Sequence, residues 1–380
     1  MKKPFGELGR CHITSRRHPG REVPPAAMLH LDRQEREEDG LLSNAQSSAI
    51  RAEDMRNKSR SPAQGTKTLA YSRIQAPLAV QCAWCEHQFD STDERLTGRV
   101  RCARCGVATT SPWPSDEQLG AAYADWYRPK SGRFAGVGDK VLRRTRSALA
   151  SRVHRMVPPG PVLDVGAGDG TLIDAFVRNG REAVGLEPHA SGPRIRQAEI
   201  EDVDGTWSAI VFWHSLEHLR RPSRALSHAA ALLRPGGMLV IAVPNATSLQ
   251  ARVFGDRWLA LDVPRHLVHL SPRALLSEIE TLGLRVERVS YLRGGQVVFG
   301  WVHGLVGKLP GHPDLYDAIR RSEARQASQK PALRLYALAA AVAALPFALA
   351  ATAVEVAVRS GGTIYVEARR QPSSTAANRA

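Results

Sequence analysis

From position 162 onward, short apolar runs alternate with stretches long enough for amphipathic helices. The runs are Val162–Val165, Ala183–Leu186, Ile210–Trp213 and Met238–Val243. This alternation is typical of a parallel β-sheet with crossover helices, so the chain is predicted to be α/β. Two helices are expected between the runs, from about Thr171 to Asn179 and from about Ser223 to Leu233. Gly180 and the stretch Arg234–Gly237 follow them as stop signals.

The pattern continues with a helix that begins at Ser271-Pro272 and a strand from Arg285 to Tyr291. A last strand is predicted from Thr363 to Ala368, and about 70 residues separate it from the strand before it. That insertion contains Leu335–Val354, an uncharged run of 20 residues, which is within the range that can span a bilayer. Pro346 near its middle predicts a break into two short helices, each too short to span alone.

Before position 79 the chain mixes charged and polar residues without helical or strand periodicity, which is typical of a disordered segment. The whole pattern gives a predicted domain organisation. Its parts are a disordered basic leader (1–78), a zinc ribbon (79–115), a helical linker (116–160), the α/β core (161–294), an apolar helical insertion (295–361), the final strand of the core (362–370) and a disordered tail (371–380).

The ribbon is inferred from two cysteine pairs. Cys82 and Cys85 form one CxxC, and Cys102 and Cys105 form the second after sixteen intervening residues. Two such knuckles complete a tetrahedral thiolate site for Zn²⁺. Because all four positions are cysteine, no position is left open, and the zinc is expected to be structural. Four free buried cysteines or a redox pair are the alternatives, although a redox pair needs no duplicate.

A glycine-rich loop follows the first strand and opens the first helix. It contains Asp164, Gly166, Gly168 and Gly170, and this place in an α/β fold binds adenosine-containing cofactors. Thr171 stands where a dinucleotide fingerprint requires a third small residue. Glu187 ends the next strand, where a carboxylate can accept hydrogen bonds from both ribose hydroxyls.

Several spaced motifs then carry a family resemblance. Trp213–Leu219 resembles "hxLEHL", and Arg234–Gly237 with Val243–Asn245 resembles "kPGG…vPN". Together with the glycine loop, these motifs resemble the class I S-adenosylmethionine-dependent methyltransferases. Cys102–Gly106, followed by Ser111–Ser115 and Tyr123, resembles a type 11/23-like subgroup with an N-terminal zinc ribbon. The "W…P.H..hfs" element of that subgroup is matched by Trp258, Pro264–His266 and His269–Ser271.

The resemblance covers roughly residues 80 to 370 and implies a Rossmann-like, seven-stranded sheet with helices on both faces. It also implies that S-adenosylmethionine binds at the glycine loop. His214 is a further cofactor-binding candidate, and Glu201 is assigned to the adenine, with Glu199 and Asp202 as alternatives. A full helix is usual after Glu187, whereas only about seven residues separate it from a strand near Ile195.

Methyl transfer from a sulfonium mainly requires that donor and acceptor be held in line, and a base is needed only for a hydroxyl-like acceptor. His266 is the preferred base, because it follows the fifth strand on the side where an acceptor enters. His218 is the second catalytic candidate and is expected to cap or pack beneath the cofactor. The alternative for His266 and His269 is that both are hydrogen-bonded loop or core residues.

The amount and distribution of charge indicate which class of acceptor the protein acts on. The net charge is +15, yet residues 161–294 hold 15 basic and 15 acidic side chains, and aromatic residues make up only 6% of the chain. A small-molecule, sugar or lipid-linked acceptor is therefore favoured over RNA methylation or a non-catalytic binding module. No signal peptide is recognised, so the cytoplasm is expected, with peripheral or monotopic contact of the insertion at an anionic inner membrane face. An alanine-rich helical pair packed on the protein itself is the other interpretation of the insertion.

Overall fold

The computed structural model describes residues 78–123, 137–188, 192–292, 295–320 and 330–372, which belong to one compact unit. Residues 1–77 of the predicted leader and 373–380 of the predicted tail lie outside the described residues.

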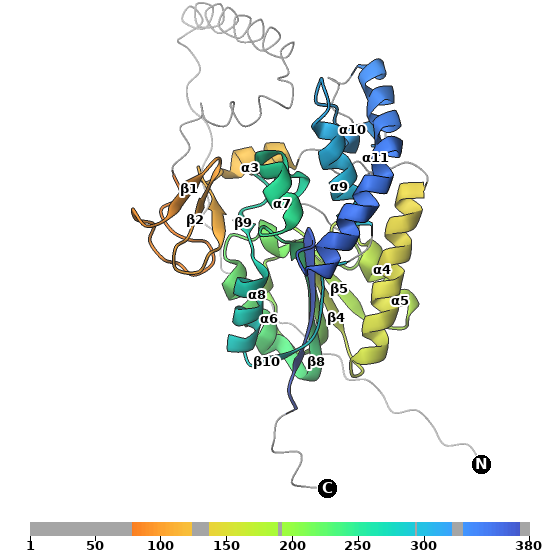
Figure 1. The fold of residues 1–380 in the computed structure, drawn as a ribbon. Helices are drawn as coiled ribbons and strands as arrows, with labels where there is room; N and C mark the ends of the chain where they lie inside the picture. The colour runs from red at the N-terminus through yellow and green to blue at the C-terminus, as the bar shows by residue number, and fades with distance from the viewer. Residues whose placement is uncertain (1–77, 124–136, 189–191, 293–294, 321–329, 373–380) are drawn as a thin grey trace, which may run out of the picture. The chain divides into compact units, whose positions relative to one another are not determined.

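A seven-stranded sheet organises the larger part of the described chain (Figure 1), and it confirms the predicted Rossmann-like fold. Five neighbouring strands are parallel, and β11 runs antiparallel to both of its neighbours, β8 and β10. In sheet order the strands are β10 (Leu284–Ser290), β11 (Thr363–Arg370), β8 (Leu233–Pro244), β7 (Trp207–Trp213), β4 (Val162–Val165), β5 (Ala183–Leu186) and β6 (Ile195–Arg196).

Alternating side chains bury both faces of this sheet. On β7, Ala209 and Val211 join an apolar cluster with α4 (Val137–Met156) and α5 (Thr171–Arg178). Ile210 and Phe212 join the opposite cluster with α6 (Pro222–Leu232) and α8 (Pro272–Thr281). Strands covered on both faces have no solvent side, which explains why they appear in the sequence as unbroken apolar runs.

Helix ends follow the predicted chemistry in two of three cases. After α5, Gly180 has φ +77°, and Arg181 N–H donates to the Phe176 carbonyl at 3.1 Å, which closes the helix. Ser271 caps α8 by accepting from Ala274 N–H at 3.3 Å.

The predicted glycine stop after α6 is wrong. The chain passes directly from Leu232 into the extended Leu233, so the stretch Arg234–Gly237 belongs to β8. Its pairing with β7 shifts there: Trp207 faces Leu233, while Ala209 faces Met238. A Cβ on Gly237 would lie 3.1 Å from the Ser208 carbonyl oxygen. The glycine therefore permits close backbone packing at an irregularity in the sheet.

The ribbon contributes three short strands, β1 (Glu94–Leu96), β2 (Arg99–Arg101) and β3 (Ala108–Thr110). The fourth strand of their sheet is β9 (Val268–His269), which comes from the far side of the core sequence. Cys82, Trp84 and Val107 lie in the same apolar cluster as one face of the main sheet. The ribbon is thus packed onto the core rather than tethered to it.

The described residues of the insertion between β10 and β11 form the helices α9 (Gln296–Gly307), α10 (Leu315–Ala318) and α11 (Pro331–Ala357). They pack on α7 (Leu249–Phe254) through a third apolar cluster that includes Phe254, Trp301 and Ala348. The predicted break at Pro346 is wrong, because α11 is one helix of 27 residues with the proline inside it. Ala337 and Ala348 are buried on either side of the proline, so packing of both halves offsets a helix penalty of about 3 kcal/mol.

A buried carboxylate fixes the C-terminal end of α11. Glu355 is fully buried and accepts hydrogen bonds from Gln250 N at 3.0 Å, Gln250 Nε2 at 2.9 Å and Trp301 Nε1 at 2.8 Å. These bonds join α11 to α7 and α9 just before the chain enters β11. Among the described helices, α11 alone is long and apolar enough to cross a membrane. Only 17% of its most apolar 18-residue stretch is buried within the protein.

Candidate active site

The glycine loop lies between β4 and α5, at the carboxyl end of the sheet. Gly166, Gly168 and Gly170 all have positive φ, at +79°, +60° and +73°. A Cβ on Gly166 would lie 2.3 Å from the Cβ of Ser215, which follows β7. Only glycine fits there, because the backbone is left-handed and a second loop presses against it.

Glu187 lies against this loop. It is 4% exposed, and its Oε2 accepts a hydrogen bond from Gly168 N–H at 2.9 Å. Gly166 N–H and Ala167 N–H both donate to the Leu186 carbonyl, at 2.8 and 2.9 Å. The structure therefore brings the predicted loop and the predicted ribose carboxylate together at the ends of two adjacent strands.

Asp164 stands at the start of the loop as a buried carboxyl group. It is 3% exposed, and its Oδ1 has no hydrogen-bond partner among the described residues. Burial raises the pKa of Asp164 to about 7, against the weaker opposing charge of Arg146. A cation bound beside Asp164 would favour its ionised form.

Other predicted cofactor residues are more dispersed. Gly170 is the N-cap residue of α5. Glu201 is exposed on η2 (Ile200–Asp202), so its assignment to the adenine stays a prediction. His214 directly follows β7 and has φ +53°, and its buried Nε2 has no hydrogen-bond partner within the described chain.

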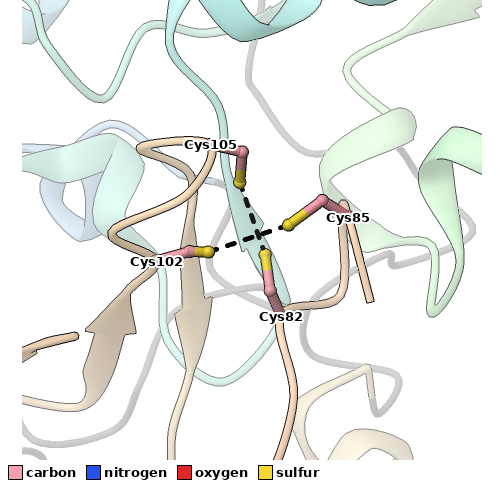
Figure 2. A group of neighbouring side chains, drawn as sticks. All are labelled: Cys82, Cys85, Cys102 and Cys105. Atoms are coloured by element: carbon pink, nitrogen blue, oxygen red, sulfur yellow. Dashed lines mark hydrogen bonds between the residues drawn. The ribbon is translucent and has the colours of Figure 1, made fainter. Parts of the chain in front are cut away.

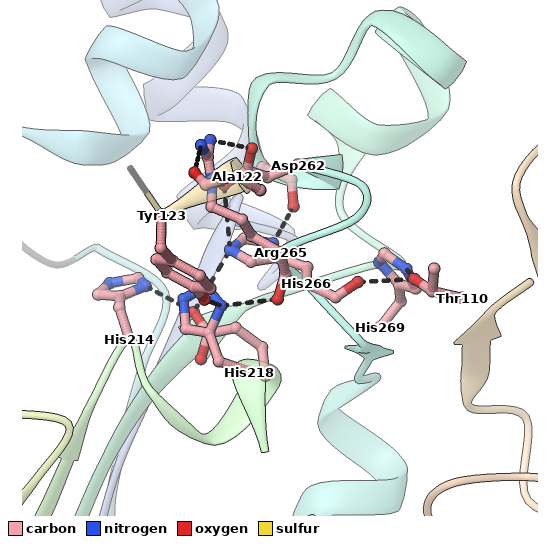
Figure 3. Close-up of polar contacts among 11 residues, drawn as sticks. Thr110, Ala122, Tyr123, His214, His218, Asp262, Arg265, His266 and His269 are labelled. Carbon is pink, nitrogen blue, oxygen red and sulfur yellow. Dashed lines mark hydrogen bonds and ion pairs between the residues drawn. The ribbon is translucent and has the colours of Figure 1, made fainter. Parts of the chain in front are cut away.

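Four residues form what we call the histidine–glutamate cluster: His214, Glu217, His218 and His266. Figure 3 shows its three histidines. Glu217 and His218 lie on the short helix η3 (Leu216–His218), and His266 comes from the loop before β9. Glu217 Oε1 is 3.4 Å from His214 Nδ1 and 3.9 Å from His266 Nε2. The His218 and His266 rings meet edge to face, with centroids 4.7 Å apart. The structure thus brings together all the predicted histidines of the site.

Carbonyl groups orient two of these rings. His218 Nδ1 lies 2.8 Å from the Arg265 carbonyl oxygen, and His266 Nδ1 lies 2.8 Å from that of Ala260. A carbonyl can only accept, so each Nδ1 carries the proton and each Nε2 keeps its lone pair. Tyr123 Oη also lies 2.8 Å from His218 Nδ1.

Electrostatics keep an anion beside one neutral ring. Burial and, to a smaller extent, the neighbouring His266 together lower the pKa of His218 to about 4. Burial also acts to raise the pKa of Glu217, but the contact with His214 and the nearby histidines outweigh it and lower that pKa to about 2. At neutral pH the cluster therefore contains an ionised carboxylate beside a neutral His218.

The ribbon and α3 (Asp116–Ala122) hold the loop that carries His266. Thr110 of β3 donates its hydroxyl to the His266 carbonyl at 2.6 Å and contacts His269 Nε2 at 3.1 Å. Arg265 binds Asp262 through two nitrogens and donates to the Ala122 carbonyl at 3.2 Å. His269 is thus a buried, hydrogen-bonded residue, in line with the alternative stated for it.

The four ribbon cysteines converge (Figure 2). Cys82 Sγ is 3.6 Å from Cys105 Sγ, and Cys85 Sγ is 3.7 Å from Cys102 Sγ. Sulfurs on a tetrahedral zinc with bonds of about 2.3 Å lie roughly 3.8 Å apart, so the donor set fits this ion. Gly106 has φ +74° and donates its N–H to the Cys102 carbonyl at 2.8 Å, which makes the second knuckle turn.

Sequence reasoning left three site residues without a role. Glu217 lies within the Trp213–Leu219 motif, and its position between His214 and His218 was the available signal. Tyr123 was noted only as part of the ribbon resemblance. Thr110 carried no signal, because its partners His266 and His269 lie more than 150 positions away in the sequence.

The chain is similar in sequence to known methyltransferases. Residues 141–289 match a family model described as a methyltransferase domain. A ubiquinone biosynthesis O-methyltransferase from Xanthomonas axonopodis pv. citri is 30% identical over 161 residues, which cover 36% of this chain and 67% of that protein. The enzyme of the same description from Nitrobacter winogradskyi is 26% identical over 151 residues, covering 34% of this chain and 58% of its own.

The chain belongs to the class I S-adenosylmethionine-dependent methyltransferases. Among solved structures, the [4+2]-cyclase SpnF aligns with TM-score 0.41 and 18% identity, covering 68% of this chain and 97% of its own. A S-adenosylmethionine-dependent methyltransferase from Archaeoglobus fulgidus aligns with TM-score 0.37 and 16% identity, covering 62% and 100%.

As a methyltransferase of this class, the chain uses S-adenosylmethionine as its methyl donor. The residues that fit the donor are those of the glycine loop with Glu187, since they combine positive-φ glycines, loop backbone amides and a buried carboxylate in one place. Their contact with the donor stays a prediction.

Asp164 provides a test of that prediction. The donor is a sulfonium cation and should bind best when Asp164 is ionised, so its affinity should rise about tenfold between pH 6 and pH 8. Calorimetry across this range measures it, with Asp164→Asn as the comparison because the amide cannot ionise. A pH dependence that is the same in both proteins would place the donor away from Asp164.

Proposed function

We propose that the chain transfers the methyl group of S-adenosylmethionine to a hydroxyl oxygen of a small-molecule, sugar or lipid-linked acceptor. The observation that supports it most is the position of the histidine–glutamate cluster. Ser215, which touches Gly166 of the glycine loop, immediately precedes the η3 helix that carries Glu217 and His218. Donor and cluster would therefore be neighbours.

In the proposed reaction, His266 takes up the proton of the acceptor hydroxyl. Its Nε2 keeps a lone pair because Nδ1–H donates to the Ala260 carbonyl, and Glu217 stabilises the imidazolium that results. The acceptor oxygen then attacks the methyl carbon in line, the carbon–sulfur bond breaks, and S-adenosylhomocysteine leaves. His218, held by the Arg265 carbonyl and Tyr123, packs against His266 and orients it.

RNA methylation receives no specific support. The last strand of the ribbon pairs with β9, and Trp84 O accepts a hydrogen bond from Ser223 Oγ on α6 at 2.8 Å. The ribbon therefore has a structural use within the chain, and it does not require a nucleic-acid partner.

The four cysteines are proposed to hold one structural Zn²⁺. Their sulfur spacing and the two knuckle turns support this assignment, and the closed thiolate set leaves no position for a reacting group. The ion would stabilise the segments on either side of β3, and β3 holds the loop of His266.

A lipid-linked acceptor is the finer proposal, and α11 supports it. One face of α11 packs on the protein through Ala337, Ala348, Thr352 and Glu355, all of which are buried. Along the rest of the helix, large apolar side chains are exposed: Leu335 by 70%, Val342 by 75%, Phe347 by 70%, Leu349 by 52% and Val354 by 55%.

Exposed Lys308, Lys330 and Arg359 flank this surface. Because Glu355 fixes the end of α11 to the core, the helix would lie on an anionic leaflet rather than cross it.

Methyl transfer is tested with purified full-length protein, methyl-labelled donor and cell extract sorted into lipid, polysaccharide, RNA and small-molecule fractions. Label should enter a fraction other than RNA. His266→Asn should reduce the rate about 10²–10⁴-fold, because it removes the base, and should leave donor affinity unchanged. His312→Asn, which changes an exposed histidine in the insertion, is the matched control. Label confined to RNA, or a fully active His266→Asn protein, would contradict the proposal.

Zinc is tested by elemental analysis, which should find one zinc bound to the cysteines of each chain. Removal of the ion with a mercurial and a chelator should abolish methyl transfer but retain donor binding, because the glycine loop and Glu187 belong to the main sheet. Cys11→Ser should keep the zinc, and Cys102→Ser should lose it. Four native thiols that titrate freely would be the opposite result.

Membrane contact is tested by flotation with vesicles that contain anionic phospholipid. The wild-type chain should float, and less of it should float in high salt. A Val342→Glu, Phe347→Glu double variant should stay at the bottom, since it places two charges on the apolar surface. The control carries the same charges at Val141 and Val253, which are exposed apolar residues outside the insertion. A wild-type protein that stays unbound at low salt would argue for an insertion packed only on its own chain.

A further inference from the structure

We propose that Glu217, His218 and His266 bind one divalent transition-metal ion, at a site separate from the four cysteines. One oxygen and two nitrogens of these side chains lie within 4.8 Å of one another. The three residues come from two segments, η3 and the loop before β9. The inference rests on the proposed function only for its consequence, which is that a bound ion would replace His266 in activating the acceptor hydroxyl; ion binding itself is measured without any acceptor.

The first reason is the carboxylate of Glu217. It is 2% exposed, and neither Oε1 nor Oε2 has a hydrogen-bond partner within the described chain. The contact with His214 Nδ1, which lies 3.4 Å from Oε1, replaces only part of the hydration that burial removes, and full loss of that hydration costs several kcal/mol per ion. A positive species between the oxygens and their neighbours offsets that cost.

The second reason is the direction of the two rings. Both His218 and His266 (Figure 3) give their Nδ1–H to backbone carbonyls at 2.8 Å, so both Nε2 atoms keep their lone pairs, and His266 Nε2 lies 3.9 Å from Glu217 Oε1. A hydrogen-bond acceptor of His266 thus faces a hydrogen-bond acceptor of Glu217. This is the outer-shell arrangement that fixes the tautomer of metal-binding histidines.

The donor set indicates the class of ion. Two imidazole nitrogens and one carboxylate suit Zn²⁺, Mn²⁺, Fe²⁺ or Co²⁺, and they leave positions open for solvent or for an oxygen of the acceptor. Ligand atoms around such an ion lie roughly 3 to 3.5 Å apart, so the three side chains must draw together by about 1 Å on binding. The ribbon site has four thiolate ligands instead, and that ligand set selects zinc.

An ion here would change the role of His266. As a ligand its Nε2 no longer accepts a proton, and the cation instead favours the ionised form of an acceptor hydroxyl placed beside it. The proton and the metal therefore compete for the same lone pairs, and metal binding should weaken as the pH falls.

The experiment uses full-length protein that retains its ribbon zinc, titrated with Mn²⁺ and followed by calorimetry and electron paramagnetic resonance. Mn²⁺ prefers oxygen and nitrogen ligands and does not displace zinc from four thiolates. The wild-type chain should bind one Mn²⁺. Glu217→Gln and His266→Ala should each weaken that binding at least tenfold, and His312→Ala should leave it unchanged.

Donor binding is measured on every variant, so a protein that has failed to fold is recognised. The wild-type titration alone already decides the question: a chain that binds S-adenosylmethionine but takes up no Mn²⁺, and no Zn²⁺ beyond the cysteine-bound ion, overturns the proposal. Mn²⁺ binding that survives both cluster substitutions overturns it as well. A chain that binds Mn²⁺ but transfers no methyl group contradicts the proposed function and leaves the metal site standing.

Discussion

Pairing between β3 of the ribbon and β9 of the core holds the loop on which the active site depends. The loop has little regular structure of its own, since β9 has two residues and η5 (Leu259–Leu261) is a single short turn. Ala108 pairs with His269 and Thr109 with Val268, and Thr110 continues the contact by donating to the His266 carbonyl. Short segments of this kind need external partners to offset their ordering entropy. The ribbon supplies them.

The main sheet positions the other part of the site, which is the glycine loop with Glu187. Loops after β4, β5 and β7 meet at one edge because parallel strands end there together. Gly166 and Ser215 touch across two of these loops, and Glu187 bonds to Gly168 across another pair. The histidine–glutamate cluster then forms where the β7 loop meets the ribbon-supported loop, and its buried carboxylate is tolerated because histidines surround it on several sides.

The insertion is constrained at both of its ends by the same sheet. It leaves β10 and must return through β11, which pairs antiparallel with β8 along seven residues from Thr363 to Arg369. Glu355 fixes α11 only a few residues before that strand, and its three donors come from α7 and α9. An apolar helix held this way has a packed side and a free side, although its sequence is apolar all round.

The sequence by itself determined the elements whose causes are local. Apolar runs predicted β4, β5, β7 and β8, closely spaced glycines after the first run marked the candidate cofactor loop, and the spacing of Cys82, Cys85, Cys102 and Cys105 predicted their convergence. Tertiary structure decided the rest, because the reasons act between distant positions. Pro346 stays inside one helix because both halves of α11 are packed, and Gly236-Gly237 joins β8 because β7 lies against it. Thr110, Tyr123 and Glu217 entered the site for the same reason: their partners lie in other segments, and only folding brings those segments within hydrogen-bond reach.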